Sequence, residues 1–306
     1  MSAKTKGILA ILVACVLWGC SGLLYDSMPE IPAFEIMAHR TLWAFVFFLC
    51  VLMVQGRGMA PLRLLRSGTN FLVVAVGAVM VGINWLMFVS AIQIDMALEA
   101  SLGYFIYPLI AVMLGRFLFG ERLGTMQAVA VTLAALAVVV LTAGVGVAPW
   151  LALLLAGSFA LYGAVKKRLE AGPVVSVAAE ALLLLPMMLG LLVVIAARGE
   201  AHFGASLRDS LLLMLTGPVT AVPLMLFSYA LRRVSMATVG LLSYLNPSLQ
   251  FLVATLIMKE PFGPWHAAAF AMIWTALALY TQASWRYDRA ARRAAVKSST
   301  LETLRR

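Results

Sequence analysis

Two prolines 139 positions apart, Pro108 and Pro247, are each preceded by side chains that can hydrogen-bond a small organic molecule. Each proline lies near the middle of an apolar segment of membrane length, where it removes a backbone donor and clashes with the preceding turn. The freed carbonyl must find a partner or line a wet cavity, because lipid offers no hydrogen bonds. Two matched interruptions of this kind predict a central site for a transported solute. The alternative is a plain kink with a packing role.

The polar side chains near these prolines form the predicted binding surface. Tyr104 and Tyr107 are three residues apart, as are Ser243 and Asn246, so each pair shares one face of a helix. For any one of them, substrate contact and hydrogen bonding between neighbouring helices are equally good interpretations. Two tryptophans could supply aromatic walls, although a single tryptophan is more often packing or an interface anchor. The predicted substrate-binding residues are Tyr104, Tyr107, Ser243, Tyr244, Asn246, Gln250, Trp85 and Trp18, and the predicted helix breaks are Pro108 and Pro247.

Charged side chains inside apolar segments are a second signal, because each costs at least about 2.5 kcal/mol at the bilayer centre. Arg40 and His39 lie about one turn into one segment, and Glu99 lies near the end of another. An Arg40–Glu99 pair would neutralise both charges near an outer mouth. Glu180, one position from the repeat counterpart of Arg40, would lie at the inner mouth. We expect all four residues to act in gating or coupling; the alternative is charge that reaches the lipid headgroups.

A proton is a candidate coupling ion. Histidine is the side chain that ordinarily titrates near neutral pH. His39 could therefore carry a proton together with Glu99 or Glu180.

The elements that position these residues must lie in a bilayer. Of 306 residues, 63% are apolar and 12% are charged, against roughly half and a quarter in an average soluble domain. A span needs about 20 mostly apolar residues. We place ten spans, at 7–24, 35–54, 70–91, 97–119, 125–143, 148–168, 174–197, 208–230, 236–258 and 265–285.

Lys and Arg fall almost entirely on one side of these spans. If the N-terminus is cytoplasmic, only Arg198, Arg208 and Lys259 face outward and Arg40 is buried. This asymmetry is the positive-inside pattern, so we predict that both termini are cytoplasmic. It also accounts for the net charge of +10 without nucleic acid as a partner. We interpret the first segment as an uncleaved span, because the bulky Trp18 stands where a lipoprotein cleavage site needs a small residue.

An internal repeat relates the two halves of the chain. Ser90–Pro108 and Tyr229–Pro247 read as the same element, and each runs on to a glutamate, Glu121 or Glu260, whose simplest role is to cap a span end. Because each half holds five spans, an odd number, the second half starts on the opposite side of the bilayer. We therefore predict an all-α membrane protein with ten transmembrane helices as two five-helix inverted repeats. The repeats cover 1–145 and 146–285, and 286–306 forms a basic cytoplasmic tail.

Motifs for other kinds of chemistry are missing from the sequence. There is no GxxxxGK[ST], HExxH or GxSxG, and the three cysteines form no CxxC. His202 and His266 are isolated and are interpreted as structural. We therefore expect no metal, no cofactor and no nucleotide-hydrolysing motor, and the expected partners are a small-molecule substrate and membrane lipids.

Several longer stretches resemble a known family. They are AHRTLW (38–43), EASLGYFIYPL (99–109), GERL (120–123), VPLMLFSYALRR (222–233), TVGLLSYLNPSLQFL (238–252) and EPF (260–262). With them the chain resembles the RarD-type branch of the EamA family, in the drug/metabolite transporter superfamily, over nearly its whole length. The resemblance implies ten spans in two inverted repeats, a bacterial inner membrane, and export of small metabolites or drugs without ATP hydrolysis. One departure is Tyr107, where the family motif leads us to expect Asn.

These observations favour a secondary transporter, an exporter of small amphipathic or zwitterionic metabolites such as amino acids or related drugs. Export rests on the resemblance alone. One alternative is a multispan membrane enzyme that acts on lipid, which would need a metal or nucleophile cluster. Another is a small-solute channel, which would need a continuous polar stripe. The sequence does not identify the substrate or the coupling ion, and it leaves both monomer and homodimer open.

Overall fold

The structure, a computed structural model, describes residues 3–119, 125–145, 150–166, 169, 171–231, 233, 242–276, 278–279 and 282–283. Within these residues the chain is helical apart from short connections and one isolated bridge between Phe203 and Ser206. The prediction of an all-α membrane protein is confirmed at this level.

The helices follow the predicted spans closely. They are α1 (Ala3–Gly19), α2 (Ser21–Asp26), α3 (Ala33–Val54), α4 (Ala60–Leu65), α5 (Gly68–Gln93), α6 (Ala97–Phe119), α7 (Thr125–Val145), α8 (Trp150–Lys166), α9 (Pro173–Ala197), α10 (Leu207–Leu231), α12 (Leu245–Leu252) and the π-helical turn η1 (Val253–Ile257). Residues 264–276 are also helical. The first predicted span is divided after Gly19, and α4 forms in the connection between the predicted spans 35–54 and 70–91, with Pro61 tolerated in its first turn.

Five of the described helical segments are long and apolar enough to cross a bilayer. They are Thr5–Asp26, Ala33–Val54, Gly68–Gln93, Val174–Ala197 and Leu207–Phe227. Shorter apolar helices cover Ala128–Gly144, Trp150–Lys166 and Leu245–Ile257. The chain is therefore a multi-pass membrane protein, and the number of ten spans stays a prediction.

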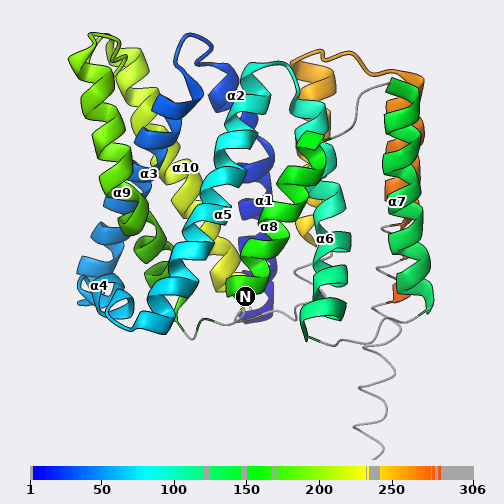
Figure 1. The fold of residues 1–306 in the computed structure, drawn as a ribbon, viewed down its shortest axis with the longest axis horizontal. Helices are drawn as coiled ribbons and strands as arrows, with labels where there is room; N and C mark the ends of the chain where they lie inside the picture. Colours follow the sequence, from blue (N-terminus) through cyan, green and yellow to red (C-terminus); the bar gives the residue numbers. More distant parts are fainter. Residues whose placement is uncertain are drawn as a thin grey trace, which may run out of the picture. The chain divides into compact units, whose positions relative to one another are not determined.

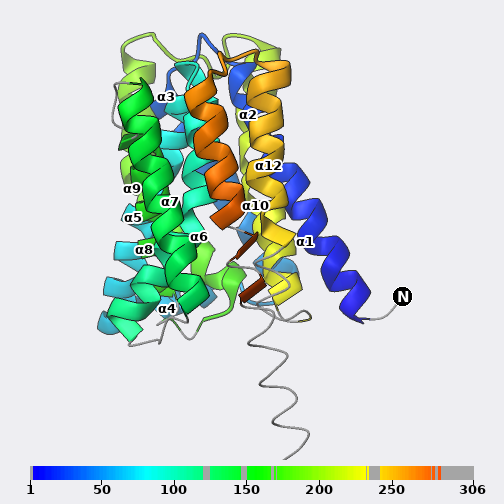
Figure 2. The ribbon, with the colours of Figure 1, turned by 90° about the vertical axis from the view of Figure 1, so that its right-hand side faces the viewer.

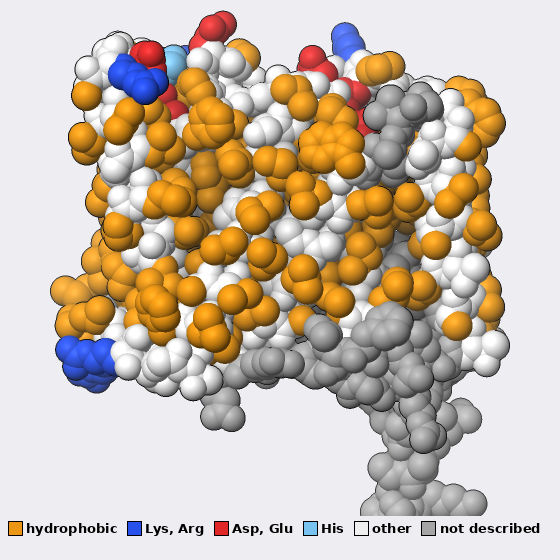
Figure 3. Space-filling view, viewed as in Figure 1, with side chains coloured by type: hydrophobic (Ala, Val, Ile, Leu, Met, Phe, Trp, Pro, Cys, Tyr) orange, Lys and Arg blue, Asp and Glu red, His pale blue; other side chains and the backbone are white. Residues whose placement is uncertain are grey.

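The outward face of these helices suits lipid rather than water. Figure 3 shows hydrophobic side chains over the band between the helix ends, and charged side chains at the ends. Large apolar side chains such as Leu72, Met187 and Val193 are more than half exposed. A water-soluble surface rarely carries apolar patches of this extent, so this band is the natural contact with acyl chains.

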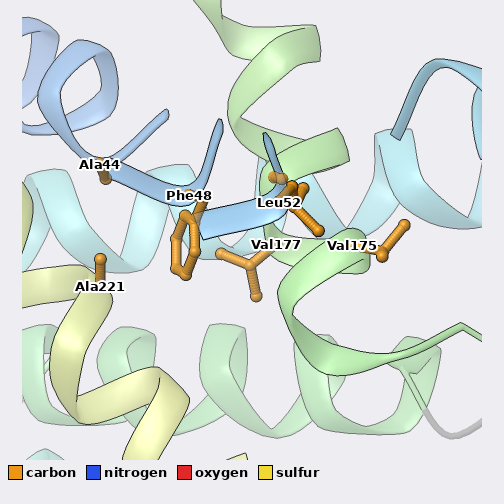
Figure 4. Close-up of a cluster of buried hydrophobic side chains, with 7 residues drawn as sticks. Ala44, Phe48, Leu52, Val175, Val177 and Ala221 are labelled. Carbon is orange, nitrogen blue, oxygen red and sulfur yellow. The ribbon is translucent and has the colours of Figure 1, made fainter. Parts of the chain in front are cut away.

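The chain divides into two packing units, of which the larger comprises residues 1–114 and 150–261. Its centre is α3, which packs against α9 and α10 (Figure 1). The second half of α3 contacts the start of α9 through Phe48, Leu52 and Val177 (Figure 4). The first half of α3 contacts a later part of α9 through Met37, Ala38 and Met188. The two helices therefore run antiparallel.

Helix α1 crosses α10 and α12 obliquely (Figure 2). Gly19 lies so close to Leu249 of α12 that an added Cβ would stand 2.6 Å from the leucine Cβ. A glycine is therefore needed where these two helices approach each other.

The smaller unit comprises residues 115–149 and 262–306. Within it, Gly144 of α7 faces Trp265, and Phe270 contacts both Phe262 and Trp274. These two units reflect packing, whereas the repeats at 1–145 and 146–285 reflect sequence order, and the repeats stay a prediction.

The two repeated prolines differ in their surroundings. Residues 242–243 are helical, Tyr244 is in a turn, and α12 begins at Leu245, so the chain is interrupted just before Pro247. By contrast, α6 remains helical through position 108. An effect of Pro108 on α6 is thus a bend within the helix rather than an end of it.

The side chain of Glu260 caps the N-terminus of α6. Its Oε1 accepts the backbone N–H of Ala97 and its Oε2 accepts that of Leu98, both at 2.7 Å. The flanking residues Asp95 and Lys259 have φ of 55° and 58°, a left-handed conformation that side chains rarely adopt. The interpretation of Glu260 as a cap is confirmed, although it caps a helix of the other half; Glu121 lies outside the described residues.

Candidate substrate-binding site

A buried hydrogen-bond network centred on Asn84 joins three helices. The Asn84 Nδ2 of α5 donates to the Leu155 carbonyl at 2.9 Å and to Ser158 Oγ at 3.1 Å, both on α8. The Tyr104 hydroxyl of α6 donates to Asn84 Oδ1 at 3.0 Å. Asn84 is 1% exposed, so every one of these bonds lies away from solvent. This network holds the predicted Tyr104 side chain in one orientation.

A series of aromatic ring contacts extends from Tyr104 in both directions. On one side Tyr104 contacts Phe88 at 5.7 Å between centroids, and Phe88 contacts Tyr25 at 6.0 Å. On the other side Tyr104 contacts Phe159 at 6.1 Å. Phe159 in turn contacts Tyr107 at 4.9 Å and Tyr162 at 5.8 Å. We call this series the aromatic chain; its members are Tyr25, Phe88, Tyr104, Phe159, Tyr107 and Tyr162.

Arg40 lies at one end of the aromatic chain. Its guanidinium carbon is 4.4 Å from the centroid of Trp85 and 5.6 Å from that of Tyr25. Both are cation–π contacts, which strengthen when water is excluded. The prediction that Arg40 pairs with Glu99 is wrong: both residues are described, and no ion pair joins them. The guanidinium instead stacks on aromatic faces, a mode that arginine allows because its charge is planar and delocalised.

Glu180 lies at the other end of the aromatic chain. Its Oε2 accepts the hydroxyl of Tyr162 at 3.1 Å, and its Oε1 accepts the Lys166 ammonium at 2.6 Å. Lys166 also donates to Ser176 Oγ. The Glu180 side chain is 3% exposed and that of Lys166 is 22% exposed. The acid is therefore a buried, paired carboxylate rather than a charge that reaches headgroups.

The second proline contacts α6 directly. Ser101 Oγ donates to the carbonyl of Pro247 at 2.9 Å, from one turn before Tyr104. Ser101 and Tyr104 share a helix face because they are three residues apart. The face of α6 that carries Tyr104 thus also meets α12, which carries Asn246 and Gln250.

Several buried polar atoms near these elements lack a hydrogen-bond partner. An unsatisfied buried donor or acceptor costs about 1–3 kcal/mol, so a group of them suggests a place for water or a ligand. Among the described residues these atoms are His39 Nδ1, Arg40 Nε and Nη1, Trp43 Nε1, Asn246 Oδ1 and Gln250 Oε1. Five of these six atoms belong to residues predicted at the site from the sequence, His39, Arg40, Asn246 and Gln250.

The remaining predicted residues lie in other surroundings. His39 stacks on Phe203 at 4.8 Å and so faces the connection between α9 and α10. Trp18 contacts Phe227 of α10 at 5.8 Å. Glu99 is half-buried in the first turn of α6. Ser243 and Tyr244 are half-buried ahead of α12, and the side chain of Pro108 lies outside the described residues.

The sequence analysis missed Asn84 and the partners of Glu180. An amide within an apolar span was the available signal for Asn84, because an amide is costly in hydrocarbon unless it is bonded. Lys166 falls at the cytoplasmic end of the predicted span 148–168, and nothing in the sequence pairs it with Glu180; in the structure it ends α8 and forms an ion pair with Glu180 of α9. No group of three or more His, Cys, Asp or Glu that could hold a metal occurs in the described part of the chain.

His202, interpreted as structural, holds the start of α3. Its backbone N–H donates to Glu35 Oε1 at 2.9 Å, and its Nδ1 lies 2.8 Å from Glu35 Oε2. The connection between α9 and α10 is thereby fastened to the end of α3 that precedes Arg40.

Comparison with known proteins agrees with this architecture. The sequence pattern of the EamA-like transporter family matches the chain twice, at residues 5–143 and 147–282. A solved crystal structure superimposes with a TM-score of 0.63 over 90% of this chain and 97% of that one, at 20% identity. At this identity the likeness supports the fold alone.

Several related proteins are similar to this one over almost the whole chain. "Uncharacterized transporter YojE" of Bacillus subtilis (strain 168) is 35% identical over 94% of this chain and 97% of its own length. "Protein RarD" of Escherichia coli (strain K12) is 39% identical over 92% and 96%. "Chloramphenicol-sensitive protein RarD" of Pseudomonas aeruginosa is 31% identical over 91% and 94%. The chain therefore belongs to the EamA-like transporter family, as a RarD-type membrane transporter.

Proposed function

We propose that this protein is a secondary transporter of the bacterial inner membrane that exports small amphipathic or zwitterionic metabolites, such as amino acids or related drugs. The observation that carries the proposal is the aromatic chain, whose buried and half-buried ring contacts link Arg40 to Glu180. Its rings offer apolar surface to an organic solute, and its two ends offer one charged group each. This combination suits a small amphipathic molecule better than a multivalent anion.

Alternating access is the mechanism that we infer. The double match of the family's sequence pattern, at 5–143 and 147–282, supports a duplicated chain. The bond from Ser101 to Pro247 supports a meeting of the two repeated proline elements. Two five-helix repeats of opposite orientation would then present one site to either face of the membrane in turn.

The ten-span topology has a direct test. We expect green fluorescent protein fused after Arg306 to fluoresce, because the tail is cytoplasmic in this proposal. A cysteine placed at Glu200, in a variant that lacks Cys15, Cys20 and Cys50, should react with a membrane-impermeant maleimide added outside spheroplasts. A dark fusion, or labelling only after the membrane is opened, would contradict the orientation.

Transport itself is tested by counterflow into proteoliposomes of the full-length protein. Liposomes are loaded with an unlabelled mixture of amino acids, and entry of each labelled amino acid or of labelled chloramphenicol is followed. A transporter gives saturable entry that depends on the internal load. Flux without saturation would favour a channel, and release of products from the lipid would favour an enzyme.

A proton is the coupling ion that we propose. Glu180 is a buried carboxylate held by Lys166 and Tyr162, so a change in its protonation would alter both contacts. His39 is the second candidate, with a buried Nδ1 that has no partner. Uptake should accelerate under an imposed pH gradient, and Glu180→Gln should remove that acceleration. Equal rates with and without the gradient would exclude the proton.

A further inference from the structure

We propose that Arg40 binds the carboxylate group of the transported molecule, which makes the substrate class an organic monocarboxylate with an apolar or aromatic body. This inference rests on the proposed function and deepens it, because the sequence assigned Arg40 only to gating or coupling.

The guanidinium of Arg40 is a buried cation with two nitrogens that lack a hydrogen-bond partner. Arg40 is 6% exposed, and its Nε and Nη1 have no hydrogen-bond partner. A guanidinium cannot lose its proton in a protein, so it cannot escape the cost of burial by becoming neutral. The two unbonded nitrogens therefore carry a desolvation cost, which an acceptor from a bound molecule would relieve.

Aromatic rings lie against the guanidinium of Arg40. Trp85 and Tyr25 lie against it at 4.4 Å and 5.6 Å, as rings do when they cover the face of a planar cation. Ring faces accept no in-plane hydrogen bonds, so the N–H groups at the edges of the guanidinium stay available. A planar carboxylate is the group that matches these edges, and arginine is the residue that recognises it with paired bonds.

Arg40 forms no ion pair with an acid among the described residues. Both carboxylate oxygens of Glu35, earlier on the same helix, are bonded to His202. The neighbouring His39 is stacked on Phe203. A single cation among aromatic rings balances one negative charge, whereas a doubly charged phosphate would need a second cation. The site therefore favours a monocarboxylate over a phosphate.

The guanidinium of Arg40 lies at one end of the aromatic chain. Tyr25, which contacts Arg40, is also the first ring of the aromatic chain. A ligand whose carboxylate lies on Arg40 can extend its apolar part along Phe88 toward Tyr104. In this arrangement Arg40 binds the charged group of the ligand, and the rings contact its apolar body.

The test uses phenylacetate and L-phenylalanine as probes on the purified full-length protein in detergent, with thermal unfolding as the readout. Both probes should raise the midpoint of wild type in a concentration-dependent way, whereas phenylacetamide and L-phenylalaninamide should not. Arg40→Gln should weaken binding of the carboxylates at least about tenfold, since charge-assisted bonds are lost. Arg40→Lys should retain part of it. Arg198→Gln, which changes an exposed arginine after α9, is the matched control and should bind as wild type does.

A second variant separates a binding role from a structural one. Arg40→Met removes an unsatisfied buried charge, so without probe it should unfold at or above the wild-type midpoint, yet it should not respond to phenylacetate. A large loss of stability in Arg40→Met would assign Arg40 to the fold and overturn the proposal. An equal response of wild type and Arg40→Gln, or no response of wild type to either carboxylate, would also overturn it.

Two further experiments identify the anion that binds at Arg40 and show which proposal fails, the carboxylate site or the transport mechanism. Inorganic phosphate, or micelles doped with phosphatidylglycerol, should give no shift that depends on Arg40; such a shift would replace the carboxylate with a phosphate ligand. Carboxylate binding through Arg40 without counterflow would leave this site standing and refute the transporter mechanism. Saturable counterflow that Arg40→Gln leaves unchanged would support the transporter mechanism and refute the carboxylate site at Arg40.

Discussion

Replacing Glu260 tests whether one half of the chain caps a helix of the other half. The Glu260 side chain is 7% exposed and accepts the N–H groups of Ala97 and Leu98, both residues being buried. Glu260→Ala leaves these two donors without an acceptor, and each such buried group costs about 1–3 kcal/mol. Partial entry of water offsets some of this, so we expect a total loss of about 2–4 kcal/mol in the free energy of unfolding.

Glu260→Gln should cost much less than Glu260→Ala. Burial raises the pKa of Glu260, the N–H bonds from Leu98 and Ala97 oppose the rise, and the charges of Glu99 and Asp95 add to it. A raised pKa means that the folded state disfavours the charged carboxylate, so losing the charge removes a penalty. Glutamine also keeps one acceptor oxygen for the helix. We expect a loss below about 1 kcal/mol.

The raised pKa also sets the sign of the pH dependence. The folded protein holds the Glu260 proton more tightly than the unfolded chain does. The stability contributed by this protonation is therefore fully present below the ordinary pKa of 4.5, and it is lost as pH rises through the raised folded value. Glu260→Gln has no proton to lose here, so the wild-type slope above pH 4.5 should be reduced in this variant.

The assay is thermal unfolding of the purified full-length protein, followed by tryptophan fluorescence from about pH 4 to pH 8, the range around the ordinary carboxyl pKa. For a chain of this size about 1 kcal/mol corresponds to roughly 2 °C, so Glu260→Ala should lower the midpoint by about 4–8 °C at neutral pH. Glu200→Ala, at an exposed glutamate, is the control. Equal midpoints for Glu260→Ala and wild type would mean that Glu260 caps nothing. A glutamine variant as unstable as the alanine variant would refute the argument from burial.

Three further predictions concern the packing and the site. Glu180→Leu alone should cost about 1–3 kcal/mol, because it leaves the half-buried Lys166 ammonium without its acid. Glu180→Leu with Lys166→Met should recover much of the loss, and a double-mutant cycle of midpoints decides. Gly217→Ala should cost about 1–3 kcal/mol because its Cβ would collide with the backbone of α3. Gly190→Ala, with no atom within 4 Å, should instead stabilise α9 by up to about 1 kcal/mol; equal midpoint shifts would refute the α3–α10 crossing. Tyr104→Phe removes the donor to Asn84 and should slow counterflow while the protein stays folded, as size-exclusion profiles would show.

The sequence was sufficient for the helices because apolar length is a strong signal. The predicted span 97–119 coincides with α6, and 35–54 differs from α3 by two residues at one end. The division after Gly19 was missed because the apolar run continues across it, and hydropathy does not register a local turn. Helix α4 was missed because glycines and Pro61 indicate a turn, while a proline is equally acceptable at the first turn of a helix.

The site was only partly predictable because polarity identifies a residue but not its partner. Tyr104 was chosen for its hydroxyl, and it does take part in a buried network. Arg40 was chosen for its charge, and a carboxylate was expected to balance it. The structure places aromatic faces there instead, and periodicity alone cannot distinguish a ring from an acid across a helix interface.

The packing of α3 against α9 sets the separation between Arg40 and Glu180, the charged residues at the two ends of the aromatic chain. Arg40 lies beside the layer formed by Ala38 and Met188, and Glu180 is eight residues before Met188 on α9. Because α3 and α9 run antiparallel, the step from Ala38 to Arg40 shortens this offset, and the Cα atoms of the two charged residues differ in depth by ~9 Å at 1.5 Å per residue. Under the proposed transport mechanism, the two ends serve different stages, because a carboxylate bound at Arg40 lies between one and two helix turns in depth from Glu180 and the rings between them carry no charge.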